Sequence, residues 1–396
     1  MQPPILLDMS HTSHTRARTG VQRVVRAIRR ELPGAMPICF DPYEGTWRPL
    51  EAWETQNLNS GDSATGRGAK WPLSARLRGR LRRLRQGPSP LAGLDGSGAE
   101  SNGGLVVPEI FSPDVAAALP SLFGMTKGPR VALFHDAIAL QFPEFSPRAT
   151  VARFPGYLRQ LLAFDGIAAN SAASRDALNG YWRWLGVAGT PPVEVIPLGV
   201  DPAPPAPAVE SGSDVPTVLS VGSIEGRKNH VGLLEACEVL WSRGLRFRLR
   251  LLGLANAETG AAPLQLMEKL RSAGRPLTYD GPVGDKALDG AYRQCAFTVY
   301  PSLAEGFGLP VAESLTRGKP CICSSKGALG EIAKGGGCIE LESLDAAAIA
   351  EAVARLIEAP QELSALAASA RSRRFATWSD YAAELTRWMA SLRRRN

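Results

Sequence analysis

Two glutamates, Glu305 and Glu313, enclose the segment EGFGLPVAE, whose residue types and spacing are the best suited to chemistry in this chain. The segment follows an apolar run at 297–302 and precedes helix-forming residues, so the pattern predicts a strand, a glycine loop and a helix start. Gly306 and Gly308 let a ligand approach the backbone, and the free amides of a helix start favour anions. We expect Glu313 to lie about two turns into this element, on roughly the same side as Glu305.

Two carboxylates beside an amide-lined anion site suit a sugar nucleotide, because amides hold phosphate oxygens while the acids accept hydrogen bonds from sugar hydroxyls. The alternative is an ordinary loop before a helix with solvated glutamates. A second motif favours the first interpretation. Residues 216–222 are typical of a buried strand that opens a new domain, and the loop 223–230 carries Arg227 and Lys228.

Ligands bind at the carboxyl ends of the strands in a doubly wound sheet, so this loop and the Glu305 loop can face one crevice. Two adjacent cations there would neutralise a diphosphate. A surface Arg-Lys pair is the structural alternative, which the proximity to Glu305 disfavours.

Residues 221–230 and 305–313 resemble the two signatures of GT-B glycosyltransferases of family GT4 (group 1). They are most similar to the mannosyltransferase-like branch of bacterial surface polysaccharide biosynthesis. Weaker similarities lie at 134–136, 169–171 and 195–201. The resemblance implies an α/β chain with the GT-B fold, in which two Rossmann-like doubly wound parallel-sheet domains face a central cleft.

This family transfers a hexose from a nucleotide sugar to a hydroxyl group with retention of the anomeric configuration. For this chain the resemblance implies GDP-mannose as the first donor and a growing, lipid-linked glycan of lipopolysaccharide or capsule as the acceptor. Other donors stay open, namely dTDP-rhamnose, a UDP-sugar or another GDP-sugar. A GT-B-type sugar-nucleotide epimerase, an inactive scaffold and a basic nucleic-acid-binding protein are rival interpretations.

The resemblance also assigns roles to residues. Arg227 and Lys228 would stabilise the charge that grows on the leaving diphosphate, and one such preorganised contact typically lowers a barrier by about 3 kcal/mol. Glu305 would hold sugar hydroxyls, and Glu313 would accept hydrogen bonds from the ribose. The other expected donor-binding residues are Gly306, Phe307, Gly308, Leu309, Gly253, Val283 and Gly20.

An apolar run in the N-terminal half, 131–134, ends at His135 and Asp136, so both are predicted at a strand's carboxyl end. A lone histidine is more often structural than catalytic. By resemblance, His135 would be catalytic, contacting the donor sugar or positioning the attacking hydroxyl, and Asp136 would lie on the acceptor side.

Family members usually carry two or more glycines in the loop after the first strand, whereas this chain has one, Gly20. This departure leaves a second interpretation open, in which Arg18 and Arg23 bind an anionic acceptor. A merely basic helix start is the third.

The length of 396 residues and the apolar content of 44% are sufficient for two α/β domains with separate cores. We expect an acceptor domain at 1–200 with a basic, mobile insertion at about 57–104, and a Pro-rich linker at 201–216. A nucleotide-sugar domain would follow at 217–376. The last helix, at 377–396, either crosses back onto the first domain or packs on the second.

A predicted helix within 73–85 combines four leucines at helical spacing with six arginines, which fits an anionic membrane surface. A solvated helix on its own domain is the alternative. No stretch reaches the roughly 20 apolar residues that span a bilayer. We therefore expect a cytoplasmic protein, peripheral on the inner face of the bacterial inner membrane. The net charge of +7 also permits nucleic acid as a partner, but no interleaved aromatic residues or RNA motif support it.

The six cysteines are scattered without zinc spacing, although Cys321 and Cys323 alternate onto one face of a predicted strand. Two cations and helix amides at the diphosphate would make a metal dispensable. The sequence predicts no cofactor and no metal, only the nucleotide-sugar donor as a substrate.

Overall fold

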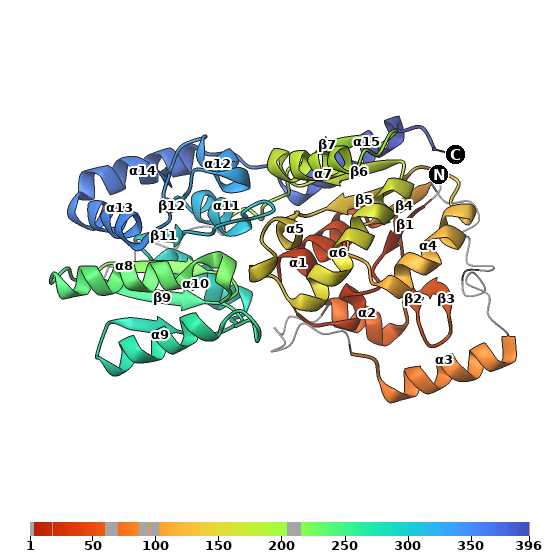
Figure 1. The fold of residues 1–396 in the computed structure, drawn as a ribbon, viewed down its shortest axis with the longest axis horizontal. Coiled ribbons are helices and arrows are strands. Elements are labelled where there is room, and N and C mark those ends of the chain that lie inside the picture. Colours follow the sequence, from red (N-terminus) through yellow and green to blue (C-terminus); the bar gives the residue numbers. More distant parts are fainter. Residues whose placement is uncertain are drawn as a thin grey trace.

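The computed structural model of the protein describes residues 4–17, 19–59, 70–86, 94, 103–203 and 215–395. Two α/β units lie side by side within these residues, each built on its own sheet (Figure 1). The strands of the first unit are β1 (Ile5–Asp8), β2 (Met36–Asp41), β3 (Thr46–Pro49), β4 (Gly104–Val107), β5 (Arg130–Phe134), β6 (Gly166–Ala169) and β7 (Val193–Val195). Its helices are α1 (Gly20–Glu31), α2 (Ala52–Asn59), α3 (Leu73–Gln86), α4 (Pro113–Met125), α5 (Ile138–Gln141), α6 (Arg148–Gln160) and α7 (Ala172–Trp184), with 3₁₀ turns η1 (Thr12–His14), η4 (Pro143–Phe145) and η5 (Leu161–Ala163).

The second unit follows the segment that the sequence predicts as a linker, of which 204–214 lie outside the described residues. Its strands are β8 (Thr217–Val221), β9 (Arg248–Leu252), β10 (Leu277–Tyr279), β11 (Phe297–Tyr300), β12 (Cys321–Ser324) and β13 (Cys338–Leu341). Its helices are the 3₁₀ turn η6 (Gly226–Lys228), α8 (His230–Ser242), α9 (Ala261–Ser272), α10 (Asp285–Gln294), α11 (Leu309–Thr316), α12 (Gly327–Ala333), α13 (Ala346–Glu358) and α14 (Pro360–Ser372), and the chain continues into α15 (Trp378–Ser391).

Both sheets are doubly wound. The strand orders are β3-β2-β1-β4-β5-β6-β7 and β10-β9-β8-β11-β12-β13, so the order reverses direction at β1 and at β8. Neighbouring strands are parallel except for β3, which runs antiparallel to β2. Crevices form at the carboxyl ends of strands where such a reversal occurs. The predicted α/β architecture with two parallel sheets is confirmed.

Helices cover the faces of each sheet, so central strands such as β4 and β5 are buried on both faces. Strand β4 illustrates this alternation. Leu105 and Val107 pack into one core with α4 and α6, whereas Val106 between them packs into the core on the opposite face, with α1 and α15. The buried runs that the sequence pattern identified as strands therefore position the loops at their carboxyl ends.

Helix α15 packs against the first sheet, although it follows the second unit in the chain (Figure 1). Thr377 caps its N-terminus and forms reciprocal hydrogen bonds with Asp380. Tyr381, Leu385 and Met389 share a buried core with α1 and β5. Of the two positions that the sequence left open for the last helix, the structure has the one on the first unit.

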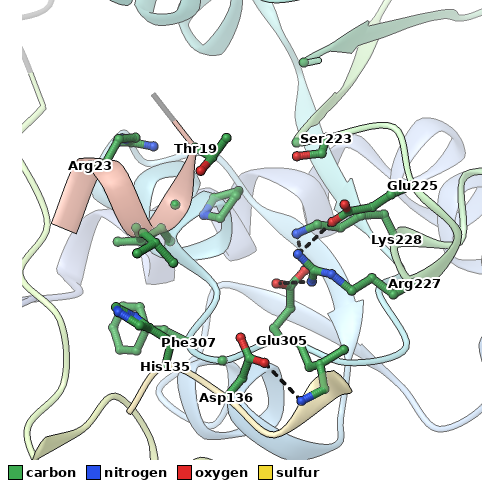
Figure 2. Close-up of a pocket in the computed structure, with 18 of the residues that line it drawn as sticks. Thr19, Arg23, His135, Asp136, Ser223, Glu225, Arg227, Lys228, Glu305 and Phe307 are labelled. Carbon is green, nitrogen blue, oxygen red and sulfur yellow. Dashed lines mark hydrogen bonds and ion pairs between the residues drawn. The ribbon is translucent and has the colours of Figure 1, made fainter. Parts of the chain in front are cut away.

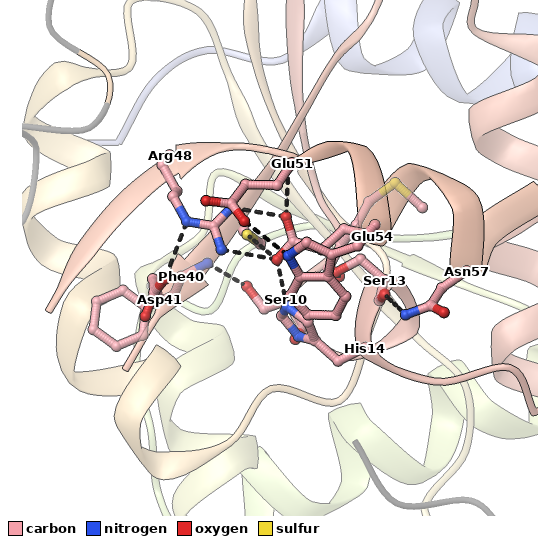
Figure 3. A network of polar contacts seen from close by, with 12 residues as sticks. Ser10, Ser13, His14, Phe40, Asp41, Arg48, Glu51, Glu54 and Asn57 are labelled. Carbon is pink, nitrogen blue, oxygen red and sulfur yellow. Dashed lines mark hydrogen bonds and ion pairs between the residues drawn. The ribbon is translucent and has the colours of Figure 1, made fainter. Parts of the chain in front are cut away.

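The loop after β1 is held by a buried polar network (Figure 3). The guanidinium of Arg48 on β3 donates to both carboxylate oxygens of Glu54, at 2.7 and 2.9 Å, and to Asp41 at 3.1 Å. His14 Nε2 lies 2.7 Å from Glu54 Oε1, and its ring stacks on Trp71 at 4.0 Å. This network fixes the turn η1, which precedes α1 and the cleft.

Candidate active site

A cavity of about 440 Å³ lies between the two units, at the carboxyl ends of strands from both sheets. The second unit contributes the loops that follow β8, β9 and β11, and the first contributes the ends of β5 and β6 and the start of α1. Figure 2 shows charged side chains of both units converging there. The two loops that the sequence predicted to face one crevice do so.

Glu305 forms ion pairs with Arg227 and Lys228, the two residues predicted to bind phosphate. Arg227 Nη1 donates to Glu305 Oε2 at 2.8 Å and to the Ala304 carbonyl at 3.0 Å, and Lys228 Nζ forms an ion pair with Glu305 Oε1 (Figure 2). Arg227 Nη2 also lies 2.7 Å from Glu225 Oε1. The cluster thus holds two cations and two carboxylates.

The neighbouring cations keep the Glu305 carboxylate ionised. Burial acts to raise the pKa of Glu305, but Arg227 and Lys228 outweigh it and lower the pKa to about 2. Burial lowers the pKa of Lys228 although Glu305 lies beside it. A diphosphate entering the cavity would therefore compete with Glu305 for the two cations.

The backbone around Glu305 requires glycine. Gly308 has φ +110° and precedes α11, so the helix begins only at Leu309, with Pro310 in its first turn. A Cβ on Gly306 would lie 2.2 Å from the His135 carbonyl oxygen of the first unit. The backbones of the two units therefore lie in close contact at this edge of the cavity.

Glu313 departs from its predicted position. It lies one turn inside α11 rather than two turns into an element that includes Glu305, because Gly308 stops the helix from extending back. Its carboxylate forms an ion pair with Arg23 of α1 and accepts a hydrogen bond from the Tyr292 hydroxyl at 3.2 Å. It borders a neighbouring cavity, which Arg23 lines as well as the first. Glu305 lines the first cavity and Glu313 the neighbouring one.

His135 lines the cavity, but its ring is engaged by the protein. Nε2 donates to the Pro108 carbonyl at 2.7 Å, and Nδ1 lies 3.0 Å from the amide nitrogen of Asn170. Burial lowers the pKa of His135, although the Pro108 carbonyl and Asp136 oppose the shift. The imidazole is therefore neutral near pH 7, with both nitrogens occupied.

Asn170 is a site residue that the sequence did not single out beyond a weak similarity at 169–171. It is buried, lines the cavity, and its side-chain oxygen has no hydrogen-bond partner among the described residues. A buried amide oxygen without a partner is costly, so it is suited to accept a hydrogen bond from a substrate hydroxyl. The sequence signal that could have identified Asn170 is its position directly after the apolar run that forms β6.

The remaining predicted donor residues line the same cavity: Gly20, Gly253, Val283, Gly306, Phe307, Gly308 and Leu309. Gly253 has φ +141°, and a Cβ there would lie 1.9 Å from the Gly222 carbonyl. Of the acceptor-side residues, Asp136 and Arg23 also line the cavity, and Arg18 lies outside the described residues. Asp136 Oδ1 accepts a hydrogen bond from the Ile138 amide at 3.0 Å.

The fold is that of the GT-B class of two-domain proteins. HepE from Anabaena, solved in complex with UDP and glucose, has a TM-score of 0.69 to this chain at 16% identity, covering 98% of this chain and 100% of its own. Residues 207–373 match the family described as glycosyl transferases group 1. The predicted resemblance is confirmed.

Two curated relatives are mannosyltransferases of Escherichia coli. O-antigen chain mannosyltransferase B is 36% identical over 122 residues, which cover 31% of this chain and 32% of the relative. The serotype-specific mannosyltransferase WbdA is 24% identical over 364 residues, which cover 83% of this chain and 40% of the relative. The chain thus spans about a third to two fifths of the length of these relatives.

Proposed function

We propose that this protein is a retaining, GT4-like glycosyltransferase that moves a hexose from a nucleotide sugar to a hydroxyl of a growing bacterial surface glycan. The observation that carries the proposal is the meeting of Arg227, Lys228 and Glu305 in one cavity between the two units. Two cations suit a diphosphate, and a carboxylate suits sugar hydroxyls. The family match of the second unit supports the same class of substrate.

In the proposed reaction, the donor diphosphate displaces Glu305 from Arg227 and Lys228, and the freed carboxylate accepts hydrogen bonds from the sugar. The bond between the anomeric carbon and the diphosphate oxygen breaks, and the acceptor oxygen bonds to the same face of that carbon. The acceptor proton passes to the leaving diphosphate oxygen. His135 is compatible with this path, because a neutral ring with both nitrogens engaged leaves the diphosphate as the base.

The positive charge for the leaving group comes from Arg227, Lys228 and the backbone amides at the start of α11. We therefore propose that catalysis needs no metal ion, and that EDTA leaves the transfer rate unchanged. Glu313 is proposed to hold the ribose hydroxyls once it has released Arg23.

Mannose from GDP-mannose is the first donor candidate, because both E. coli relatives are named mannosyltransferases. The structural neighbour HepE was solved with UDP and glucose, so the base needs a direct test. A thermal-shift panel of GDP, UDP, dTDP, ADP and CMP supplies it. A nucleotide at about 100 times its Kd stabilises the fold by roughly 2.7 kcal/mol.

We expect one nucleotide to raise the Tm selectively, and an Arg227→Ala, Lys228→Ala double variant to lose the shift. The matched control is Lys269→Ala with Arg271→Ala, which removes one lysine and one arginine from exposed positions on α9. Incubation with the matching nucleotide sugar then distinguishes transfer or hydrolysis, which supports the proposal, from interconversion of two sugar nucleotides, which indicates an epimerase. No shift with any nucleotide would contradict the proposed donor site.

Helix α3 presents its leucines to solvent. Its small residues face the first unit, where Ala75 is buried and a Cβ on Gly79 would lie 2.9 Å from Tyr43. Arg78 and Arg82 pair with acidic residues of that unit, Glu51 at 2.8 Å and Glu44 at 3.5 Å. The exposed fractions of the leucines are 75% for Leu73, 60% for Leu77, 54% for Leu81 and 83% for Leu84. The alternative from the sequence, a solvated helix on its own domain, is compatible with these contacts as well.

This orientation supports the proposal that α3 docks the protein on the anionic inner leaflet, where a lipid-linked acceptor would be presented. Four exposed leucines can enter the acyl boundary while the surrounding arginines meet lipid phosphates. None of the described helices is long and apolar enough to cross a bilayer. Docking would therefore be interfacial, through α3 at the periphery of the first unit (Figure 1).

Flotation with vesicles of anionic and of neutral lipids tests this docking. We expect binding to anionic vesicles only, and its loss in a Leu77→Ser, Leu81→Ser variant. Leu185→Ser with Val239→Ser is the control, because these residues are also exposed but lie outside α3. Absence of binding, or equal binding by the Leu77/Leu81 variant, would refute membrane docking without affecting the donor site.

A further inference from the structure

Three cysteines converge in the second unit. Cys321 and Cys323 are two residues apart on β12 and therefore point to the same face of the sheet. Cys338 on the neighbouring strand β13 is the register partner of Cys321, which brings its side chain to that face as well. The three sulfur atoms lie within 4.8 Å of one another, and all three cysteines are free.

The trio sits between the sheet and the helices that cover it. Cys321 and Cys323 are fully buried in a core with Leu315 of α11 and Ala370 of α14. Cys338 is less buried and lies on the edge strand of the sheet, so it forms the open side of the cluster. Cys338 is therefore the member of the trio nearest to solvent.

A second group of potential ligands among the described residues, His14, Cys39 and Glu54, already holds a cation. Arg48 occupies both oxygens of Glu54 there (Figure 3). The cysteine trio contains no cationic side chain, and its members are thiols alone. Thiolates are soft ligands that select zinc and other thiophilic ions over magnesium or calcium.

We propose that Cys321, Cys323 and Cys338 form a binding site for a single thiophilic metal ion of the Zn²⁺ and Cd²⁺ class. A zinc-sulfur bond of about 2.3 Å places three thiolates about 3.8 Å apart around a tetrahedral ion, so sulfur atoms that lie within 4.8 Å of one another need to approach by about 1 Å at most. A solvent molecule on the less buried side, near Cys338, would complete a four-coordinate site.

Charge near the trio is compatible with this ion. Three thiolates and one divalent ion carry a net charge of −1. Arg373 donates hydrogen bonds to the carbonyls of Gly336, at 2.8 Å, and Ile332, at 2.9 Å, immediately before β13. Its guanidinium therefore supplies a positive charge beside the site.

The bound ion would link β12 to the edge strand β13 beneath α11, the helix that carries Glu313. Metal binding to the folded state adds to its stability, since the unfolded chain holds no preformed site. This role is structural, and it is independent of the proposed donor chemistry because the trio lies outside the residues that line the cavity.

The test uses the full chain, purified with a reductant and a chelator and then titrated with Cd²⁺ under anaerobic conditions. We expect one ion per chain, a cadmium-thiolate charge-transfer band in the ultraviolet and a rise in Tm. Cys338→Ala, at the most accessible position, should lose both the band and the Tm rise. Cys237→Ala, a single buried cysteine elsewhere in the unit, should retain both.

If Cys338→Ala does not fold, Cys323→Ala provides the same readout from the other strand. Absence of the band in the unaltered protein, or an equal band in the trio variant, would overturn the proposal. A disulfide within the trio that mass spectrometry detects once the reduced protein is exposed to air, together with no Cd²⁺ uptake by the reduced protein, would also overturn it and assign the trio to redox chemistry.

Discussion

Glu305 forms ion pairs with both cations of the proposed donor site, Arg227 and Lys228. Glu305→Gln keeps the size of the side chain but removes this carboxylate, so that Glu225 beside Arg227 is the remaining acid of the cluster. We expect a nucleoside diphosphate to bind more tightly to this variant, while sugar transfer falls by about 10² to 10³, because the sugar loses its carboxylate partner. Calorimetry and turnover rates measure the two effects separately. The control Glu268→Gln, on an exposed turn of α9, should change neither quantity. Equal losses of nucleotide binding and of sugar transfer in Glu305→Gln would contradict this division of roles.

Asp8 should make stability depend on pH. Burial and the nearby Glu109 raise its pKa to about 7 from an ordinary value of 3.8. The folded state therefore binds more protons between these values, and stability falls as the pH rises through this range. Asp8→Asn removes the titration but keeps an oxygen for the Ser10 amide and hydroxyl. Between pH 5 and 8 the Tm of the unaltered protein should decline relative to the variant; parallel profiles would contradict the assignment. Glu54 and Glu305, with pKa values of about 2, titrate below this window.

At the scale of elements, the sequence predicted the strands and loops that carry the cavity. The runs at 216–222 and 297–302 contain β8 and β11, because apolar residues bounded by glycine and proline signal buried parallel strands. The helix start after the glycine loop was also predicted, but Glu313 lies one turn into α11 rather than two, because the left-handed Gly308 places the first helical residue at Leu309. Local spacing could not reveal that Cys338 joins Cys321, because that contact depends on strand register.

Gly306 controls how closely the β11–α11 loop meets the first unit. Gly306→Ala would place a methyl group 2.2 Å from the His135 carbonyl, so one loop must shift. We expect a loss of about 1–3 kcal/mol of stability from this overpacking and a large loss of transfer. Gly290→Ala, within α10 where nothing lies within 4 Å of the added methyl, should instead raise stability by about 0.5–1 kcal/mol. Chemical denaturation with activity assays compares the two, and full activity in Gly306→Ala would show that the close approach is dispensable.

At the scale of the whole molecule, side chains far apart in sequence join the two units. Glu331 of α12 accepts hydrogen bonds from the amides of Ala172 and Ala173 at the start of α7, at 3.0 and 2.7 Å. Ser171 donates to the Gly306 carbonyl at 2.8 Å. No local pattern encodes such pairs, because each depends on how two independently folded sheets face each other. The sequence therefore predicted the two halves of the site better than the contacts that hold them together.

The ion pair between Arg23 and Glu313 joins the units at the border of two cavities. If Glu313 holds the ribose of a bound donor, the nucleotide must compete with Arg23 for this carboxylate. A double-mutant cycle of Arg23→Ala and Glu313→Gln should then give a coupling of about 1–2 kcal/mol in the free protein, within the usual range for contacting residues. The coupling should fall towards zero at saturating nucleotide, and Arg23→Ala alone should bind nucleotide more tightly. The surface pair Arg355 and Glu362 is the control, since its coupling should not respond to the nucleotide. A coupling between Arg23 and Glu313 that persists in the nucleotide complex would show that the pair is a permanent link between the units and that the ribose is bound elsewhere.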